Sequence, residues 1–193
     1  MITHIRGKLV EKNPTFAIIE CNGIGYFINI SLHTFSKIPD IEAIKLYTYL
    51  SVKEDSQTLF GFSDKVEREV FKLLISVSGV GTSIARTMLS SMTPEQIQHS
   101  IASEDVATIQ SVKGIGAKTA QRVIIDLKDK IVKTYLLSED YVKSDNTIKD
   151  EALSALEVLG FSRKQVEKLV HKIIQESPDT TLENIIKRAL KNL

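Results

Sequence analysis

The sequence predicts an α+β protein built from several small domains, with strands first and helices in the rest of the chain. Short apolar runs separated by turn residues fill about the first sixty positions. Apolar residues then recur at helical spacing, and a polar stretch interrupts that pattern before the last helices. We therefore expect a barrel over 1–62, a helical domain over 63–135, a flexible linker over 136–147 and a three-helix domain over 148–193.

The first region has the pattern of a small β-barrel. Residues 16–21 form an apolar run, Asn22-Gly23 is a tight-turn dipeptide, and apolar residues alternate with others over 24–30. Further β-rich runs cover 44–52 and 57–62. A five-stranded oligonucleotide-binding (OB) barrel is one architecture that fits these short strands.

Helix signals organise the middle of the chain. Ser63 and Asp105 are plausible N-caps, and Thr93-Pro94 places proline at the first position of a helix. A last helix should run from Gly116 to about Val132. The middle region is therefore expected to be entirely helical.

Three short helices fit the C-terminal region, at 148–159, 162–175 and 181–190. Gly160 is a natural stop for the first of them, and Ser162 with Gln165 forms a capping box at the start of the second. So small a unit has a thin core, so part of its apolar surface is expected to serve a partner.

The composition is that of an ordinary globular protein, with 42% hydrophobic residues and a net charge of +1 over 193 residues. Because no region is markedly basic, DNA binding would have to rely on local geometry. The single cysteine, Cys21, lies in an apolar run, which favours core packing over catalysis. No signal peptide or membrane-spanning run is visible, which predicts a cytoplasmic location.

A short pattern that occurs twice carries most of the functional information. Gly79-Val80-Gly81 and Gly114-Ile115-Gly116 each place an apolar residue between two glycines at the start of a helical segment. Such turns let the backbone approach a bulky partner, and the helix N-terminus then offers N–H groups to an anion. Each turn alone could be a plain helix–helix connection, but two in similar surroundings indicate a device that holds backbone phosphates at two points.

The second turn is the better phosphate site. Lys118 and Arg122 lie four residues apart on one helix face, and Thr119 adds a hydroxyl. After the first turn only Ser83 and its neighbouring hydroxyl are close, and the next cation is Arg86. Two phosphate sites on one helical body predict binding without sequence preference and with a clear salt dependence.

Several kinds of chemistry are missing from the sequence. The Lys-Thr pair after Gly116 resembles a phosphate loop, but that motif needs glycine directly before lysine and Ala117 intervenes. The four histidines are scattered without metal-ligand spacing, and no nucleophile–base pair stands out. We expect a binding module without metal or cofactor. A nuclease or glycosylase, and a scaffold that binds only protein, remain the alternatives.

An acidic pair is the other local peculiarity. Glu54 and Asp55 lie between two β-runs. They are either part of a solvated turn or a device whose carboxylates repel phosphates and keep DNA strands apart.

With these residues in hand, the whole chain resembles the RuvA family of Holliday-junction-binding proteins. The resemblance rests on both glycine turns and on several further segments. These are Ile5-Arg6-Gly7, Glu54-Asp55-Ser56-Gln57, Leu59-Phe60-Gly61-Phe62, Phe71 to Ile75, Lys118 to Arg122, Asp126 to Lys130, Ala152 to Leu156 and Leu159-Gly160-Phe161.

The resemblance implies an OB-fold barrel, a domain with two helix-hairpin-helix motifs and a tethered three-helix, UBA-like domain. It also implies homotetramers or octamers that hold a four-way junction open in recombination and repair. The turns would grip DNA, Glu54 and Asp55 would separate strands at a central pin, and the junction resolvase RuvC would be a further partner. The hexameric ATPase RuvB would bind the last domain, at Leu153, Leu156, Leu159, Gly160 and Phe161. The chain departs from the family where Thr82-Ser83 follows the first turn, because Pro-Lys often stands there.

Overall fold

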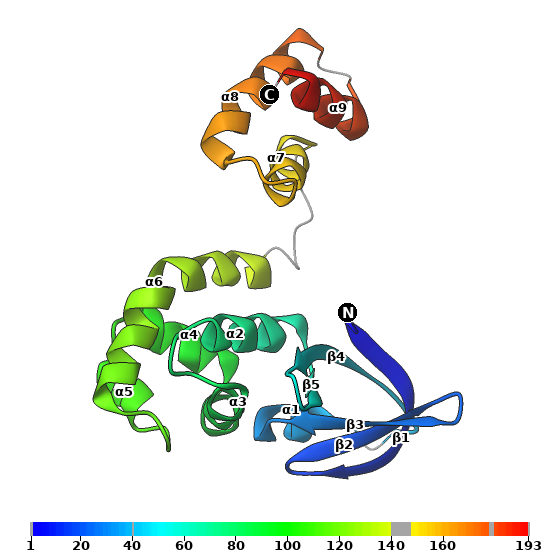
Figure 1. Ribbon diagram of the computed structural model, residues 1–193, viewed down its shortest axis with the longest axis vertical. Coiled ribbons are helices and arrows are strands. Elements are labelled where there is room, and N and C mark those ends of the chain that lie inside the picture. Colours follow the sequence, from blue (N-terminus) through cyan, green and yellow to red (C-terminus); the bar gives the residue numbers. More distant parts are fainter. Residues whose placement is uncertain (1, 40, 140–147, 178–179, 193) are drawn as a thin grey trace. The chain divides into compact units, whose positions relative to one another are not determined.

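The computed structural model describes residues 2–39, 41–139, 148–177 and 180–192 (Figure 1). The chain divides into two units, Met1–Asp140 and Tyr141–Leu193. The first unit contains a barrel followed by helices, and the second contains three helices. The predicted α+β class, with strands first and helices after, is confirmed.

The barrel consists of five strands and closes in the order β1-β2-β3-β5-β4. All neighbouring strands are antiparallel except β3 and β5, which pair in parallel through Asn29–Phe60 and Ile30–Gly61. Alternating side chains of these strands fill one core. The elements are β1 (His4–Asn13), β2 (Phe16–Cys21), β3 (Ile24–Ile30), α1 (Leu32–Lys37), β4 (Ala43–Val52) and β5 (Gln57–Phe62).

Five helices follow the barrel in the first unit, and side chains from all five pack around one apolar core. Side-chain caps fix three of their starts, because Asp64, Thr93 and Asp105 each accept a hydrogen bond from a backbone N–H three residues on. Asp64 caps the first of these helices, so the expected cap at Ser63 was wrong by one residue. The helices are α2 (Lys65–Ile75), α3 (Thr82–Ser91), α4 (Pro94–Ala102), α5 (Val106–Gln110) and α6 (Ala117–Glu139).

The barrel and the helices share buried contacts. The ring of Phe71 in α2 lies 5.2 Å from that of Phe60 and 4.9 Å from that of Phe62, both on β5. Glu67, also buried in α2, accepts hydrogen bonds from the hydroxyls of Ser31 at 2.5 Å and Thr34 at 2.6 Å. Both apolar and polar contacts therefore join the two parts of the first unit.

The last helix of the first unit is longer than expected. It continues to Glu139, so residues 136–139 of the expected linker are helical. The rest of that linker, 140–147, lies outside the described residues. In the part of the chain that the structure describes, no helix is long and apolar enough to cross a membrane.

The second unit is a three-helix bundle, as the periodicity predicts. Apolar side chains of all three helices form its core, and Ser162 with Gln165 makes the predicted capping box. The helices are α7 (Ile148–Val158), α8 (Arg163–Glu176) and α9 (Leu182–Asn192).

Candidate nucleic-acid interface

The two glycine turns have the same backbone geometry. Gly79 and Gly114 have φ angles of +94° and +95°, a region that favours glycine. In the first turn the N–H of Val80 donates to the carbonyl of Val77 at 3.0 Å. In the second, the N–H of Ile115 donates to the carbonyl of Val112 at 3.1 Å. The repeated sequence pattern is therefore a repeated structure.

The apolar residue at the centre of each turn serves as an anchor. The side chains of Val80 and Ile115 are buried in the core of the helical region, and their N–H groups close the turns. The sequence predicts both residues as members of turns that contact DNA. The structure places their side chains inward, so they hold the turns in place while the residues around them stay at the surface.

The helices that follow the turns begin without a side-chain cap. Gly81 is the N-cap of α3 and supplies no side-chain hydrogen bond, and Gly116 directly precedes α6. The first helical bonds come only from the N–H groups of Ala85 and Ala120, at 3.0 and 2.9 Å from the carbonyls of the two glycines. The N–H groups before them point out of each helix start, where the helix dipole favours an anion.

The polar residues around the second turn differ in what they contact. Lys118 is exposed and Thr119 is half-buried. Arg122 is exposed, and its Nη1 donates to the carbonyl of Ser78 in the first turn at 3.4 Å. A Cβ atom on Gly79 would lie 3.8 Å from Oγ1 of Thr119. The two turns are therefore adjacent, and Arg122 lies between them as well as beside Lys118.

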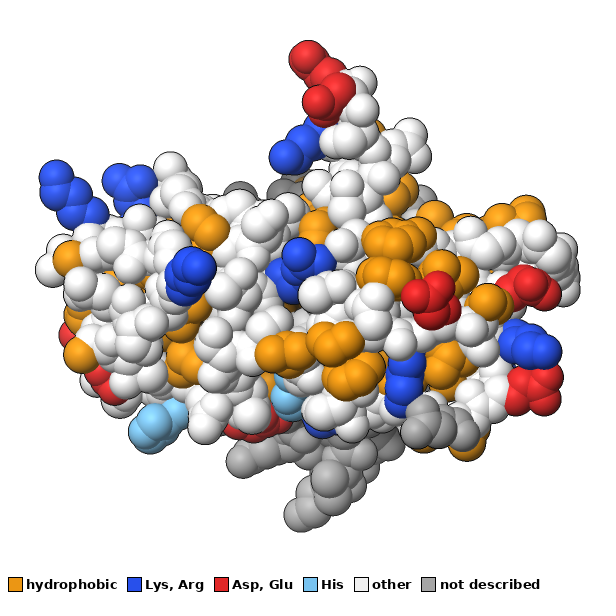
Figure 2. Space-filling model, turned by 90° about the horizontal axis from the view of Figure 1, so that it is seen from below, with side chains coloured by type: hydrophobic (Ala, Val, Ile, Leu, Met, Phe, Trp, Pro, Cys, Tyr) orange, Lys and Arg blue, Asp and Glu red, His pale blue; other side chains and the backbone are white. Residues whose placement is uncertain are grey.

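The first turn has hydroxyl groups in place of cations. Ser83, a predicted phosphate contact, is exposed on the first turn of α3. Figure 2 shows Lys and Arg side chains scattered over one face of the molecule instead of gathered in one patch. Backbone N–H groups must therefore supply a large share of any anion binding at the first turn.

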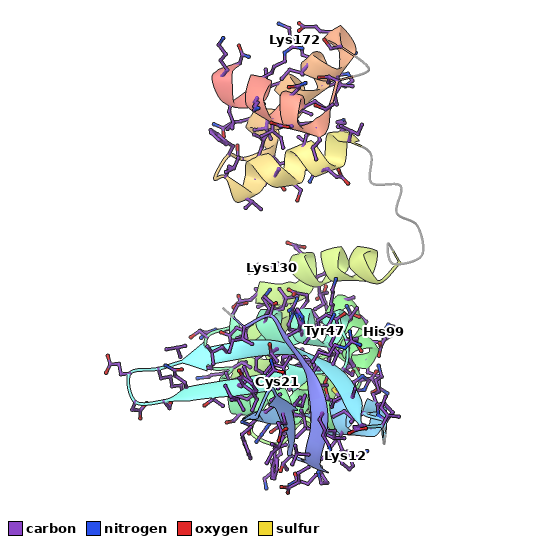
Figure 3. The ribbon with its side chains drawn as sticks, turned by 90° about the vertical axis from the view of Figure 1, so that its right-hand side faces the viewer. Lys12, Cys21, Tyr47, His99, Lys130 and Lys172 are labelled. Atoms are coloured by element: carbon purple, nitrogen blue, oxygen red, sulfur yellow. The ribbon has the colours of Figure 1, made fainter. Side chains whose placement is uncertain are left out.

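Glu54 and Asp55 are exposed at the end of the β4–β5 hairpin, which projects from the barrel (Figure 3). The N–H of Lys53 donates to the carbonyl of Ser56 at 2.8 Å, and the Ser56 hydroxyl donates to Asp55 at 3.3 Å. These local bonds close the turn, and the acidic pair lies at the end of the projecting hairpin.

One cluster in the first unit has the residue types of a metal site. A ring nitrogen of His33 and carboxylate oxygens of Asp64 and Glu67 lie within 4.8 Å of one another. Both carboxylates already accept hydrogen bonds, Glu67 from hydroxyls of the barrel and Asp64 from Lys37 and the N–H of Glu67. The cluster therefore fits a structural link better than a cation site.

The C-terminal unit presents fewer of its predicted contact residues than expected. Leu153 and Leu156 are buried in its core, and Phe161 packs half-buried against that core. Leu159 is 56% exposed beside Gly160, and Val158, which sequence reasoning missed, is 85% exposed. Val158 has an apolar side chain at the last position of α7, where it faces away from the α7 core positions 152, 153 and 156. The helical periodicity that predicted α7 could also have placed Val158 on the exposed face of that helix.

A five-stranded barrel joined to a helical body with two equivalent glycine turns defines a class of multidomain proteins with tandem helix-hairpin-helix repeats. Three family models match the chain in the same order as its parts. The RuvA N-terminal domain matches residues 1–61, the SAM-like helix-hairpin-helix tandem matches 71–129 and the RuvA C-terminal domain matches 147–193.

Curated relatives match over the full length. The chain is 66% identical over 193 residues to a protein of Christiangramia forsetii and 62% identical to one of Flavobacterium psychrophilum, with complete coverage of both chains in each pair. It is 50% identical to a protein of Cytophaga hutchinsonii, with 99% of each chain covered. All three are named Holliday junction branch migration complex subunit RuvA. This chain belongs to the RuvA family.

Proposed function

We propose that this chain binds four-way DNA junctions without sequence preference, as the non-catalytic subunit of a branch migration complex that acts in recombination and repair. The observation that carries the proposal is the pair of adjacent uncapped glycine turns in one unit with a projecting acidic hairpin. The names of the full-length relatives support it.

In this function each turn holds a backbone phosphate. The N–H groups after Gly81 and Gly116 bind phosphate oxygens, while Lys118 and Arg122 add charge and the hydroxyls of Ser83 and Thr119 add further hydrogen bonds. Val80 and Ile115 act as anchors only. Backbone contacts carry no sequence information, so binding depends on the shape of the DNA.

The acidic hairpin gives the preference for a junction. Where strands exchange, carboxylates of Glu54 and Asp55 repel phosphates and disfavour a closed duplex at that point. Four copies around one crossover would bring four acidic hairpins together at its centre, where the strands separate. We therefore propose a homotetramer, of which two copies form an octamer, working in the cytoplasm.

The motor subunit supplies the ATP-driven step. We propose that RuvB binds the C-terminal unit at the exposed side chains of Val158 and Leu159, with Gly160 and Phe161 shaping the surface. Leu153 and Leu156 support this surface from the core. RuvC is proposed as a further partner at the junction. For the RuvB surface, Leu159→Ser should weaken binding, whereas Ile148→Ser, an exposed apolar residue at the other end of α7, should not.

A titration with simultaneous mass measurement tests the central proposal. A labelled four-way junction and a linear duplex of equal length are titrated with the full chain at several salt concentrations. We expect tighter binding to the junction, four or eight copies per complex, and an affinity that falls with salt. Equal affinity for both DNAs would contradict the function, and cleavage of the junction with magnesium would favour a nuclease.

A further inference from the structure

Arg86 lies on α3, the helix that begins at the first glycine turn, but it contacts the barrel. Its Nη1 donates to Oδ1 of Asn29 at 2.7 Å and lies 3.5 Å from the carbonyl of Thr15. Asn29 is part of β3. The cation nearest the first turn in the sequence is therefore committed to the barrel.

Asn29 connects in two directions. While its Oδ1 accepts from Arg86, its Nδ2 donates to the carbonyl of Leu59 in β5 at 3.4 Å. The two ends of an amide differ, so a donor on one side and an acceptor on the other fix its orientation. Strand β5 directly follows the acidic turn. A continuous hydrogen-bond path thus leads from α3 to the strand that carries the acidic hairpin.

A second link holds the same helix against the barrel. The hydroxyl of Ser90 in α3 donates to the carbonyl of Arg86 at 2.8 Å and accepts from the N–H of Leu32 in α1 at 3.1 Å. Figure 1 shows α3 next to α1 at the barrel end of the helical region. Two attachments along one helix restrict both its distance from the barrel and its rotation.

We propose that Arg86 and Asn29 are positioning residues for junction recognition, which fix the first glycine turn relative to the acidic hairpin. This inference rests on the proposed function. A four-way junction presents its crossover at a set distance from the phosphates of each arm, whereas a linear duplex has no crossover. A loosened path should therefore reduce junction binding and leave duplex binding nearly unchanged.

The test measures affinities for junction and linear duplex, each as a function of salt, for five variants. These are Arg86→Ala, Arg86→Lys, Asn29→Ala, the double Arg86→Ala/Asn29→Ala, and the control Lys130→Ala. Arg86→Lys keeps the charge but not the planar guanidinium. Asn29→Ala changes no charge at all, and Lys130 is an exposed cation on α6 away from the path (Figure 3). Thermal unfolding verifies that each variant is folded.

We expect Asn29→Ala and Arg86→Lys each to lower the junction-to-duplex affinity ratio about tenfold, the scale of a hydrogen bond to a charged group. The double variant should be no worse than Arg86→Ala, because both changes break one path. The salt dependence of Asn29→Ala should equal that of the wild type, and Lys130→Ala should keep the ratio.

Two results would overturn the inference. One is an unchanged ratio in Asn29→Ala. The other is an equal loss for junction and duplex in Arg86→Ala with a reduced salt dependence, which would make Arg86 a phosphate contact. A wild-type protein without any preference for the junction would instead refute the proposed function, so the two failures are distinguishable.

Discussion

The two glycine turns share a backbone and differ in their surroundings. A Cβ atom on Gly79 would meet Thr119 within 4 Å, whereas one on Gly114 would meet nothing within that distance. The first turn thus packs against the start of α6. Its own helix adds only hydroxyls beside it, and the cation that contacts it, Arg122, comes from α6. The second turn is open and carries Lys118. A repeated sequence pattern has produced two equal sets of backbone donors with unequal electrostatics.

The largest expected effect comes from capping the open helices. Gly81→Asp and Gly116→Asp place a carboxylate where each helix lacks a cap, and both positions have space for a side chain. The carboxylate takes the N–H groups and repels phosphate, so junction affinity should fall about 10- to 100-fold for either change. Fluorescence titration measures the affinity.

Stability provides the control for this experiment. Aspartate is a good N-cap, so the melting temperature should stay unchanged or rise slightly. A variant that binds junctions normally would show that its turn does not contact DNA. A loss at Gly116 alone would show that the first turn is only structural.

The next effect separates the turns by charge. Lys118→Gln should lower junction affinity severalfold and reduce the slope of log affinity against log salt by about one. Ser83→Lys adds a cation at the start of α3, at the position equivalent to Lys118. It should raise junction affinity and the slope of its salt dependence by similar amounts. Titrations at four salt concentrations measure the slopes. Equal slopes in Ser83→Lys and the wild type would show that the first turn lies away from phosphates.

A smaller effect is expected from removing the acidic pair, which tests whether the turns alone give the preference for a junction over a linear duplex. The double variant Glu54→Gln/Asp55→Asn should raise affinity for linear duplex by a few-fold, because it removes repulsion from phosphates. Affinity for the junction should change less, so the ratio of junction affinity to duplex affinity should fall. Glu95→Gln, which removes a charge at the start of α4, is the control. An unchanged preference would assign selectivity to the turns or to assembly.

The smallest expected effect is on the pH dependence of stability. It concerns Asp64 and Asp105, the N-caps of the helices that lead into the two turns, α2 and α5. Burial alone would raise the pKa of Asp64, but hydrogen bonds from the N–H of Glu67 and from Lys37 lower it overall. Hydrogen bonds from the hydroxyl and N–H of Thr108 lower the pKa of Asp105. A lowered pKa stabilises the fold above the pKa of the unfolded chain, and this contribution disappears as pH falls through the folded-state pKa.

Melting temperatures between about pH 5 and pH 2 test this difference. Asp64→Asn should flatten the acid-induced decrease more than Asp105→Asn, because Asp64 is partly buried and paired with Lys37 while Asp105 is fully exposed. Equal curves for the two variants would show that the ion pair with Lys37 contributes nothing.

Local patterns predicted the local structure well. The glycine pairs located both turns, apolar and β-rich runs located β2 to β5, and the caps at Thr93, Asp105 and Ser162 are where the sequence placed them. Such features depend on a few neighbouring residues, so a single sequence contains them. Strand β1 and the short helix α1 were not located. The direction in which each side chain points was harder to predict. Only the structure shows that the side chains of Val80 and Ile115 are buried in the core.

Contacts between distant residues could not be predicted from one sequence. Nothing near Arg86 indicates that its partner is Asn29, and nothing near Arg122 indicates that it reaches Ser78. These contacts depend on how the barrel and the helices pack. The burial of Leu153 and Leu156 could have been predicted, because the helical periodicity of α7 assigns both to the core, although the sequence interpretation placed them at the partner surface.

The rings of β5 that pack around Phe71 have a consequence for how the molecule melts and evolves. Phe60 and Phe62 belong to the barrel by strand pairing and to the helical core by burial. Barrel and helices should therefore unfold in a single calorimetric transition, separate from that of the three-helix bundle. Recombination between relatives could exchange the three-helix bundle as a module. Exchange of the barrel alone would also replace Phe60 and Phe62, which are part of the core of the helical region.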